Sequence, residues 1–154
     1  MQTEGNGAGI NTSQGKLIIQ SGTITASSGR YGAGIGGGRN ESGGTIEIKG
    51  GTVTATGGSG GAGIGGGSDA PCQSVYINGG TITAKGRSNG GDGIGGGGDY
   101  TGNGGTITID SGEITAIGGY NHPGIGGAGN GSAAIIIRGE YTYSDFTRTD
   151  RTVI

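Results

Sequence analysis

The stretch GGTVTATGGSGGAGIGGG, residues 50–67, combines two patterns. Its first part alternates apolar and polar side chains, with Val53 between Thr52 and Thr54, as in a half-buried β-strand. Its second part is glycine around a single isoleucine, Ile64, a composition that is more usual in flexible linkers. The surrounding sequence decides whether this stretch is a spacer or a folded surface.

Both patterns recur along the chain. Segments such as TIEIKGGTVTA and SVYINGGTITA each hold two alternating runs separated by Gly-Gly, and a glycine-rich element follows each of them. The isoleucines of the glycine-rich elements are 25, 29, 30 and 31 residues apart: Ile10, Ile35, Ile64, Ile94 and Ile125. Such a period indicates a repeat architecture in which every unit stacks on the next one.

Each unit therefore predicts two short strands joined at a glycine corner and a third, glycine-flanked strand. The fold class is all-β, a right-handed parallel β-helix, which is a three-sided β-solenoid of about five coils of about 30 residues. The chain is expected to be one domain, residues 1–154. The coils occupy residues 7–143, and the non-repeating residues 144–154 form a C-terminal cap.

Two further expectations concern the third wall and the last coil. The isoleucines of the glycine-rich elements should be the only large inward groups of the third wall, with their glycine neighbours facing outward as bare backbone. Eleven residues separate Ile35 from Ile46 and Ile64 from Val75. The same step after Ile125 predicts that Ile136 points inward and that its two isoleucine neighbours point outward.

Composition excludes several classes of function. The 154 residues carry a net charge of −2, which gives no basic footprint for nucleic acid. No apolar run approaches the roughly 20 residues of a membrane span. A single histidine and a lone Cys72 leave little material for a metal cluster or a catalytic triad. Glu113 and Glu140 could form a general acid/base pair, but they are interpreted as solvated surface charges. We therefore expect no enzymatic activity.

Threonines form the first candidate surface. The outward positions of successive coils hold T-x-T motifs in two files: Thr23, Thr25, Thr52, Thr54, Thr81 and Thr83. Such a flat array on a β-solenoid resembles the ice-binding face of insect and bacterial antifreeze proteins. The alternative is that threonine is simply a good outward strand residue.

Asn and Asp recur five residues after each loop isoleucine, at Asn40, Asp69, Asp99 and Asn130. These residues tolerate left-handed backbone and cap turns, so a stacked structural ladder is one interpretation. The alternative is a weak calcium site between Asp69 and Asp99 on adjacent coils, because calcium prefers oxygen ligands. No other cofactor is expected.

Exposed tyrosines form the third candidate surface. Tyr31 and Tyr120 lie near the entry to the glycine-flanked strand, and Tyr100 lies in a long loop beside Asp99. Together with Asn121 they suit a sugar-binding surface, since ring faces stack on sugars and polar groups bond hydroxyls. The alternative is a set of scattered loop tyrosines.

The unit GGTVTATGG…GAGIGGG resembles the Gly-rich repeats of large surface proteins from Gram-positive anaerobes. It is also similar to the carbohydrate-binding β-helix domains of clostridial secreted proteins, and Asp92 in GDGIGGG matches their acidic turn. The resemblance implies an extracellular or cell-surface bacterial module that binds polysaccharide or host glycan, or acts as an adhesin. A structural stalk and ice binding are the alternatives. Self-association through the glycine-rich face or the coil ends remains open.

Overall fold

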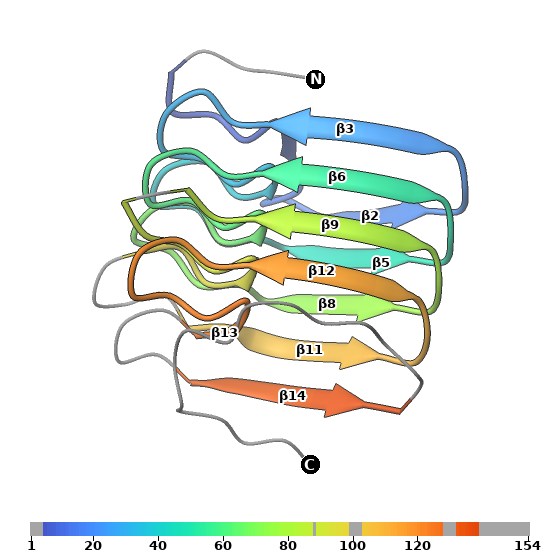
Figure 1. Cartoon of the computed structure of the whole chain (residues 1–154). Coiled ribbons are helices and arrows are strands. Elements are labelled where there is room, and N and C mark those ends of the chain that lie inside the picture. The colour runs from blue at the N-terminus through green and yellow to red at the C-terminus, as the bar shows by residue number, and fades with distance from the viewer. Residues whose placement is uncertain (1–4, 88, 99–102, 128–131, 139–154) are drawn as a thin grey trace.

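The computed structural model describes residues 5–87, 89–98, 103–127 and 132–138 (Figure 1). All regular structure in this part of the chain is β-strand, and it forms three parallel sheets. The strands of each sheet come from successive coils, one strand per coil, so the chain winds about four complete turns. Sequence had predicted this solenoid.

The three sheets are named here by their outward faces. The threonine sheet contains β3 (Thr23–Ser27), β6 (Thr52–Thr56), β9 (Thr81–Lys85) and β12 (Glu113–Ile117). The mixed sheet contains β2 (Lys16–Ile19), β5 (Thr45–Ile48), β8 (Ser74–Ile77), β11 (Gly105–Ile109) and β14 (Ala133–Ile137). The glycine sheet contains β1 (Ile10–Asn11), β4 (Ile35–Gly36), β7 (Ile64–Gly65), β10 (Ile94–Gly95) and β13 (Ile125–Gly126).

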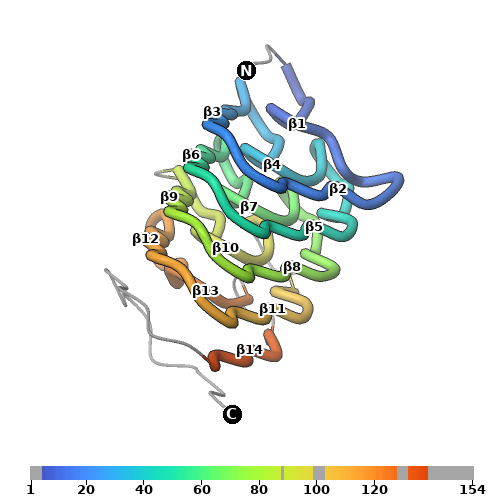
Figure 2. The backbone as a smooth tube through the Cα atoms, turned by 90° about the vertical axis from the view of Figure 1, so that its right-hand side faces the viewer, coloured from blue at the N-terminus to red at the C-terminus, as the bar shows by residue number. Residues whose placement is uncertain are grey.

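The winding is right-handed, as expected. In Figure 1 the strands of the threonine sheet run leftward in front and those of the mixed sheet run rightward behind. Figure 2 shows the same two sheets end-on, with β3 and β2 on opposite sides of the tube. Seen from the N-terminal end, the chain thus turns clockwise as it recedes. The general preference for right-handed crossovers between parallel strands accounts for this hand.

A single apolar core fills the tube. Each strand of the threonine and mixed sheets points alternate residues inward, because strand side chains alternate between faces. Ile46, Ile48 and Val53 of one coil are fully buried, and their partners in the next coil, Val75, Ile77 and Ile82, stack directly on them. The glycine sheet adds one isoleucine per coil to this core.

The glycines beside these isoleucines are buried, so the expectation of a bare outer wall was wrong. A Cβ on Gly36 would lie 1.8 Å from the carbonyl oxygen of Gly65 in the next coil. One on Gly37 would lie 1.9 Å from the carbonyl oxygen of Glu41 in its own loop. A Cβ on Gly43, in the loop that follows β4, would lie 2.7 Å from the Gly65 backbone, so backbone packs on backbone here and a side chain would clash.

The last coil also differs from expectation. Ile135 and Ile137 pair with Ile107 and Ile109 of β11, and Ile135 is buried. Ile136 instead pairs with Thr108 on the outward face. The step of 11 residues does not hold here, because the loop from Ile125 is one residue shorter. The apolar stacking of equivalent strands sets the register, and the loop adapts to it.

Glu140 and the expected cap at residues 144–154 lie outside the described residues. Within those residues, no helix has the length and apolar character that a membrane crossing requires.

Candidate functional site

One edge of the solenoid is formed by the loops that lead into the glycine sheet. Tyr31 precedes Ile35 by four residues, and Asn121 precedes Ile125 by four residues. Because these isoleucines belong to one register column, the two loops lie on the same edge. We call six residues of these loops the loop edge: Arg30, Tyr31, Ser59, Asn89, Tyr120 and Asn121.

Two arginines and one backbone hydrogen bond fix Tyr31 at this edge. The guanidinium carbon of Arg39 lies 4.6 Å from the centre of the tyrosine ring, and that of Arg30 lies 5.4 Å away. Both distances allow cation–π attraction. The Ser68 amide of the next coil donates a hydrogen bond of 2.7 Å to the Tyr31 carbonyl. The half-buried ring is therefore presented in a fixed position beside two positive charges.

Polar side chains continue the loop edge toward the fourth coil. The Asn89 amide donates a hydrogen bond of 3.1 Å to the Ser59 hydroxyl, and Tyr120 is 76% exposed. Asn121 is exposed and has a left-handed backbone (φ 58°), which asparagine tolerates. Three rungs separate Tyr31 from Asn121, which is roughly 14 Å at the spacing of neighbouring strands. The structure thus places two of the predicted tyrosines on one edge.

Two other predicted sugar-binding residues, Asp99 and Tyr100, lie outside the described residues. Tyr76 projects from β8 on the mixed sheet, away from the loop edge, and is 38% exposed.

The outward face of the threonine sheet is regular. Strand pairing aligns Thr23, Thr52 and Thr81 in one file. A second file consists of Thr25, Thr54, Thr83 and Thr115. All are exposed or half-buried, and the first file ends at Glu113 of β12. The predicted hydroxyl array is therefore present over three rungs in both files.

Asn40 and Asp69, which follow the glycine sheet in two successive coils, have the turn geometry that is predicted for them, whereas Asp99 and Asn130 lie outside the described residues. Asn40 and Asp69 both have a left-handed backbone, with φ of 59° and 60°. The Ser68 hydroxyl lies 3.4 Å from the Asp69 carboxylate. Among the residues that the structure describes, no three His, Cys, Asp or Glu side chains gather as a metal site would require. A calcium site that includes Asp99 stays a prediction, because Asp99 is not described.

A buried acid lies inside the glycine-rich wall. The Asp92 side chain is fully buried; its carboxylate accepts a hydrogen bond of 2.8 Å from the Gly96 amide and lies 3.4 Å from Nδ1 of His122. Burial raises the pKa of Asp92 to about 6, although contact with His122 and the bond from Gly96 oppose that rise. Burial, together with the negative charge of Asp92, also raises the pKa of the Cys72 thiol to about 12.

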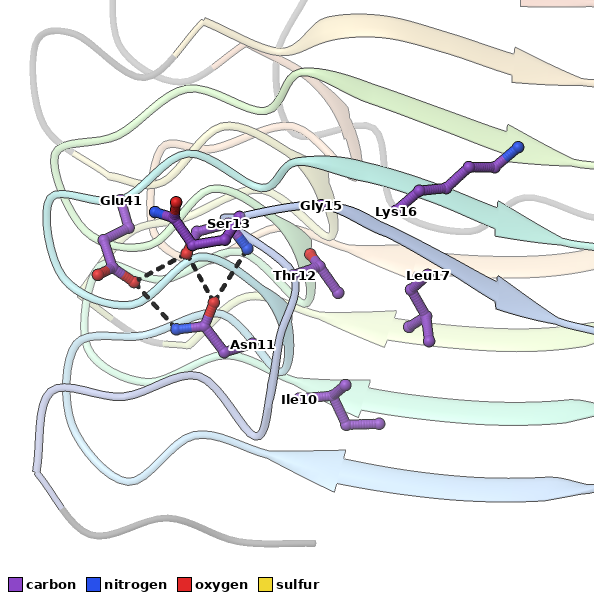
Figure 3. A pocket seen from close by; sticks show the side chains of 9 residues that line it. Ile10, Asn11, Thr12, Ser13, Gly15, Lys16, Leu17 and Glu41 are labelled. Carbon is purple, nitrogen blue, oxygen red and sulfur yellow. Dashed lines mark hydrogen bonds between the residues drawn. The ribbon is translucent and has the colours of Figure 1, made fainter.

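A pocket opens at the first coil (Figure 3). Its volume is about 430 Å³, and Asn11, Ser13 and Glu41 line its polar side. The Glu41 oxygen Oε2 accepts hydrogen bonds from the Asn11 side-chain amide (3.0 Å) and the Gly38 backbone amide (3.0 Å). The Ser13 hydroxyl lies 3.3 Å from Oε2 but only 2.7 Å from Oδ1 of Asn11, to which it donates its single proton. The two amide donors, that of Asn11 first, lower the pKa of Glu41 and keep it ionised.

The pocket exists because the first turn is short. Seven residues separate Ile10 from Leu17, whereas eleven separate the equivalent Ile35 and Ile46 in the second coil. The first coil therefore does not cover the longer loop of the second coil completely. Glu41 of that longer loop contacts Asn11 and Ser13 of the first coil across the uncovered space. Ile10 and Leu17 remain only half-buried there.

Sequence reasoning missed both the buried acid and the pocket. One signal was available: Asp92 and His122 are 30 residues apart, as are Asn11 and Glu41. This separation is close to the period of about 30 residues, so it predicts that the two polar side chains of each pair lie on neighbouring coils.

Comparison with known proteins gives one family. A sequence model of the beta-helix repeat matches residues 17–39, 46–68, 75–98 and 107–135, more than half of the chain. The chain belongs to the beta-helix repeat family. No curated protein and no solved structure matches it. The four matches follow the four coils that begin at β2, β5, β8 and β11, so this beta-helix repeat protein carries its repeat through every described coil.

Within the beta-helix repeat protein, the sheets act as a rigid frame and the loops differ from coil to coil. The loop edge offers aromatic rings, side-chain amides and the Arg30 guanidinium to a ligand that approaches from outside. The first-coil pocket offers an ionised carboxylate over an apolar floor. Both arrangements suit the binding of neutral polar molecules.

Proposed function

We propose that the chain is a non-enzymatic bacterial surface module, displayed outside the cell, that binds polysaccharide through its loop edge. The observation that carries the proposal is the placement of Tyr31 and Tyr120 on one edge. The Tyr31 ring lies beside two arginine guanidinium groups, and the Tyr120 side chain is 76% exposed. The resemblance to carbohydrate-binding β-helix domains supports the same ligand class.

The physical basis is the chemistry of sugars. A pyranose ring has an apolar C–H face that stacks on an aromatic ring, and hydroxyls that need hydrogen-bond partners at its rim. Ser59, Asn89 and Asn121 supply such partners in the roughly 14 Å between the two tyrosines. A polymer that runs along the solenoid axis would contact both rings at once, which raises its effective affinity above that of either contact.

Binding to a panel of insoluble and soluble polysaccharides tests the proposal. We expect Tyr120→Ala to weaken binding roughly tenfold, because one stacked ring contributes on the order of 1 kcal/mol or more. Tyr76→Ala is the matched control, since Tyr76 is exposed on a different face. Retention of no polysaccharide, or equal loss in both variants, would contradict the proposal and favour a structural stalk of a larger surface protein.

Ice binding by the threonine sheet is a second candidate. The observation that favours it is the alignment of six threonines in two files over three rungs. Thermal hysteresis that disappears in Thr54→Leu and persists in Thr45→Leu would support it, because Thr45 lies on the mixed sheet. Hysteresis that is absent, or equal in both variants, would exclude it.

A further inference from the structure

We infer that the first-coil pocket is a second binding site, separate from the loop edge, which accepts one neutral, hydroxyl-rich sugar unit. The inference takes its ligand class from the proposed function, but its location and its residues are independent of the loop edge. Pockets of about 300–1,000 Å³ are typical for small molecules, and this one measures about 430 Å³.

The polar side of the pocket is pre-organised for hydroxyl groups. The Asn11 and Gly38 amides hold Oε2 of Glu41, with the Ser13 hydroxyl 3.3 Å away, and in the described part of the chain no hydrogen bond engages its other oxygen, Oε1. Oε1 therefore remains as an ionised acceptor on a carboxylate that is already fixed in place, at the rim of the pocket and on the side away from Ile10 and Leu17 (Figure 3). A sugar hydroxyl that donates to Oε1 would form a charge-assisted hydrogen bond, which is stronger than one between neutral groups.

The apolar side of the pocket suits the C–H face of a sugar ring. Ile10 and Leu17 are half-buried, whereas their partners in the second coil, Ile35 and Ile46, are fully buried. Figure 3 shows Ile10 and Leu17 on the side of the pocket away from the Glu41 carboxylate. A ring seated on these two side chains would remove them from water, which is favourable in proportion to the apolar area covered.

Charge excludes acidic sugars from the site. The Lys16 ammonium lies 2.7 Å from the carboxylate of Glu47, so its charge is already paired. Its side chain extends away from Glu41 in Figure 3. The remaining charge at the pocket is that of Glu41, which repels a uronate or a sulfated sugar. The site should therefore discriminate glucose from glucuronate by charge alone.

Two-dimensional NMR with isotope-labelled protein tests the inference. Glucose, galactose, mannose, N-acetylglucosamine and glucuronate are titrated one at a time at millimolar concentration. We expect at least one neutral sugar to shift the backbone amide signals of Asn11, Ser13 and Glu41, and glucuronate to leave them unmoved. Glu41→Gln should weaken that binding roughly tenfold, because the amide oxygen stays with the Gly38 and Asn11 donors and an NH2 group, which donates, replaces the acceptor Oε1.

Glu41→Gln keeps an acceptor oxygen for the Gly38 amide, so the loop should remain folded, which the unchanged signals of the other coils would verify. Glu113→Gln is the control, because it makes the same change at an exposed position of β12. Absence of shifts at the pocket with every sugar overturns the inference, even if polysaccharide still binds in a Tyr120-dependent way. Pocket shifts without polysaccharide retention would instead uphold the inference and refute the loop edge.

Discussion

Asp92 occupies a position where the two preceding coils carry alanine. Ala33, Ala62 and Asp92 each donate a backbone hydrogen bond to the carbonyl four residues ahead, so the backbone there is the same in all three coils. The backbone conformation at this position therefore does not depend on the Asp92 carboxylate, because alanine gives the same hydrogen bond. An ionised group in a dry wall destabilises the folded state unless its partners compensate.

The pH dependence of stability should therefore change in Asp92→Ala. The pKa of Asp92 rises from 3.8 to about 6 on folding, so the folded state binds the proton more tightly than the unfolded state. Protonated Asp92 therefore stabilises the folded state. This stabilisation is fully present below pH 3.8 and is lost as the pH rises through about 6. As the pH rises from 4 to 7, the free energy of unfolding of wild type should therefore fall by up to about 3 kcal/mol relative to that of Asp92→Ala.

Urea unfolding at the two pH values measures this fall. Asp110→Ala serves as the control, because Asp110 is 44% exposed and its contact with Arg138 is a surface ion pair of small energy. A difference between Asp92→Ala and wild type that is the same at both pH values would show that Asp92 does not titrate in this range.

Cys72 offers a second test at a single residue. The side chain is 3% exposed, and its pKa of about 12 leaves almost no thiolate at neutral pH. Because the thiolate is the reactive form, we expect a thiol-specific reagent to label Cys72 only when the coils open. Labelling rates measured across a urea series should follow the unfolding transition. Rapid labelling in native buffer would contradict the burial of this thiol.

At the scale of the strand, the glycine sheet depends on the absence of side chains. Gly65 has a φ of +134°, and a Cβ there would lie 2.0 Å from the Gly95 carbonyl oxygen of the next coil. Both the backbone conformation and the close approach require glycine. The neighbouring rungs hold their glycines in the same way, so no single coil can move aside to make room.

Gly65→Ala should consequently lower the free energy of unfolding by more than about 3 kcal/mol, the range of severe backbone and packing defects. Gly15→Ala is the matched control, because no atom lies within 4 Å of the added methyl group and φ is not positive. That variant should be neutral or stabilising by up to about 1 kcal/mol. Denaturant midpoints of equal value for the two variants would show that the wall is more open than the structure indicates.

The strands of the threonine and mixed sheets were predictable from sequence, because residues such as Ile46, Ile48 and Val53 alternate strictly with polar neighbours. The glycine-rich loops were not predictable in detail. Because glycine has no side chain, its spacing in the sequence does not distinguish exposed backbone from buried backbone. The burial of Gly36 could therefore not be predicted. Loop length also misled the prediction for Ile136, since loops absorb insertions while stacked strands keep their register.

The candidate sites were predictable only in part for a related reason. The T-x-T files and the position of Tyr31 follow from counting along strands and loops. The pocket follows from a comparison between two loop lengths, and the bond from Asn11 to Glu41 joins two coils. Contacts between loops of adjacent coils can be predicted from the sequence only when the alignment of these loops is known, because their lengths differ.

At the scale of the whole molecule, the coils present different chemistry on each side. The threonine sheet presents small hydroxyls, whereas the mixed sheet carries an ion-paired cluster of Lys16, Glu47 and Lys49. The loop edge carries aromatic rings. Because each coil contacts only its neighbours, these surfaces can vary independently while the core stays the same. Stability should then accumulate coil by coil.

Removal of one coil tests this additivity. Deletion of residues 36–64 joins Ile35 to Gly65 and recreates the sequence GAGIGGG at the junction. Since Ile35 and Ile64 are register partners, the remaining coils should close up by one rung without strain. We expect the circular dichroism per residue to be unchanged and the dependence of the unfolding free energy on urea to fall by roughly a fifth, in proportion to the surface buried. A deletion variant without sheet signal would show that the coils fold only as one complete set and that their stabilities do not add.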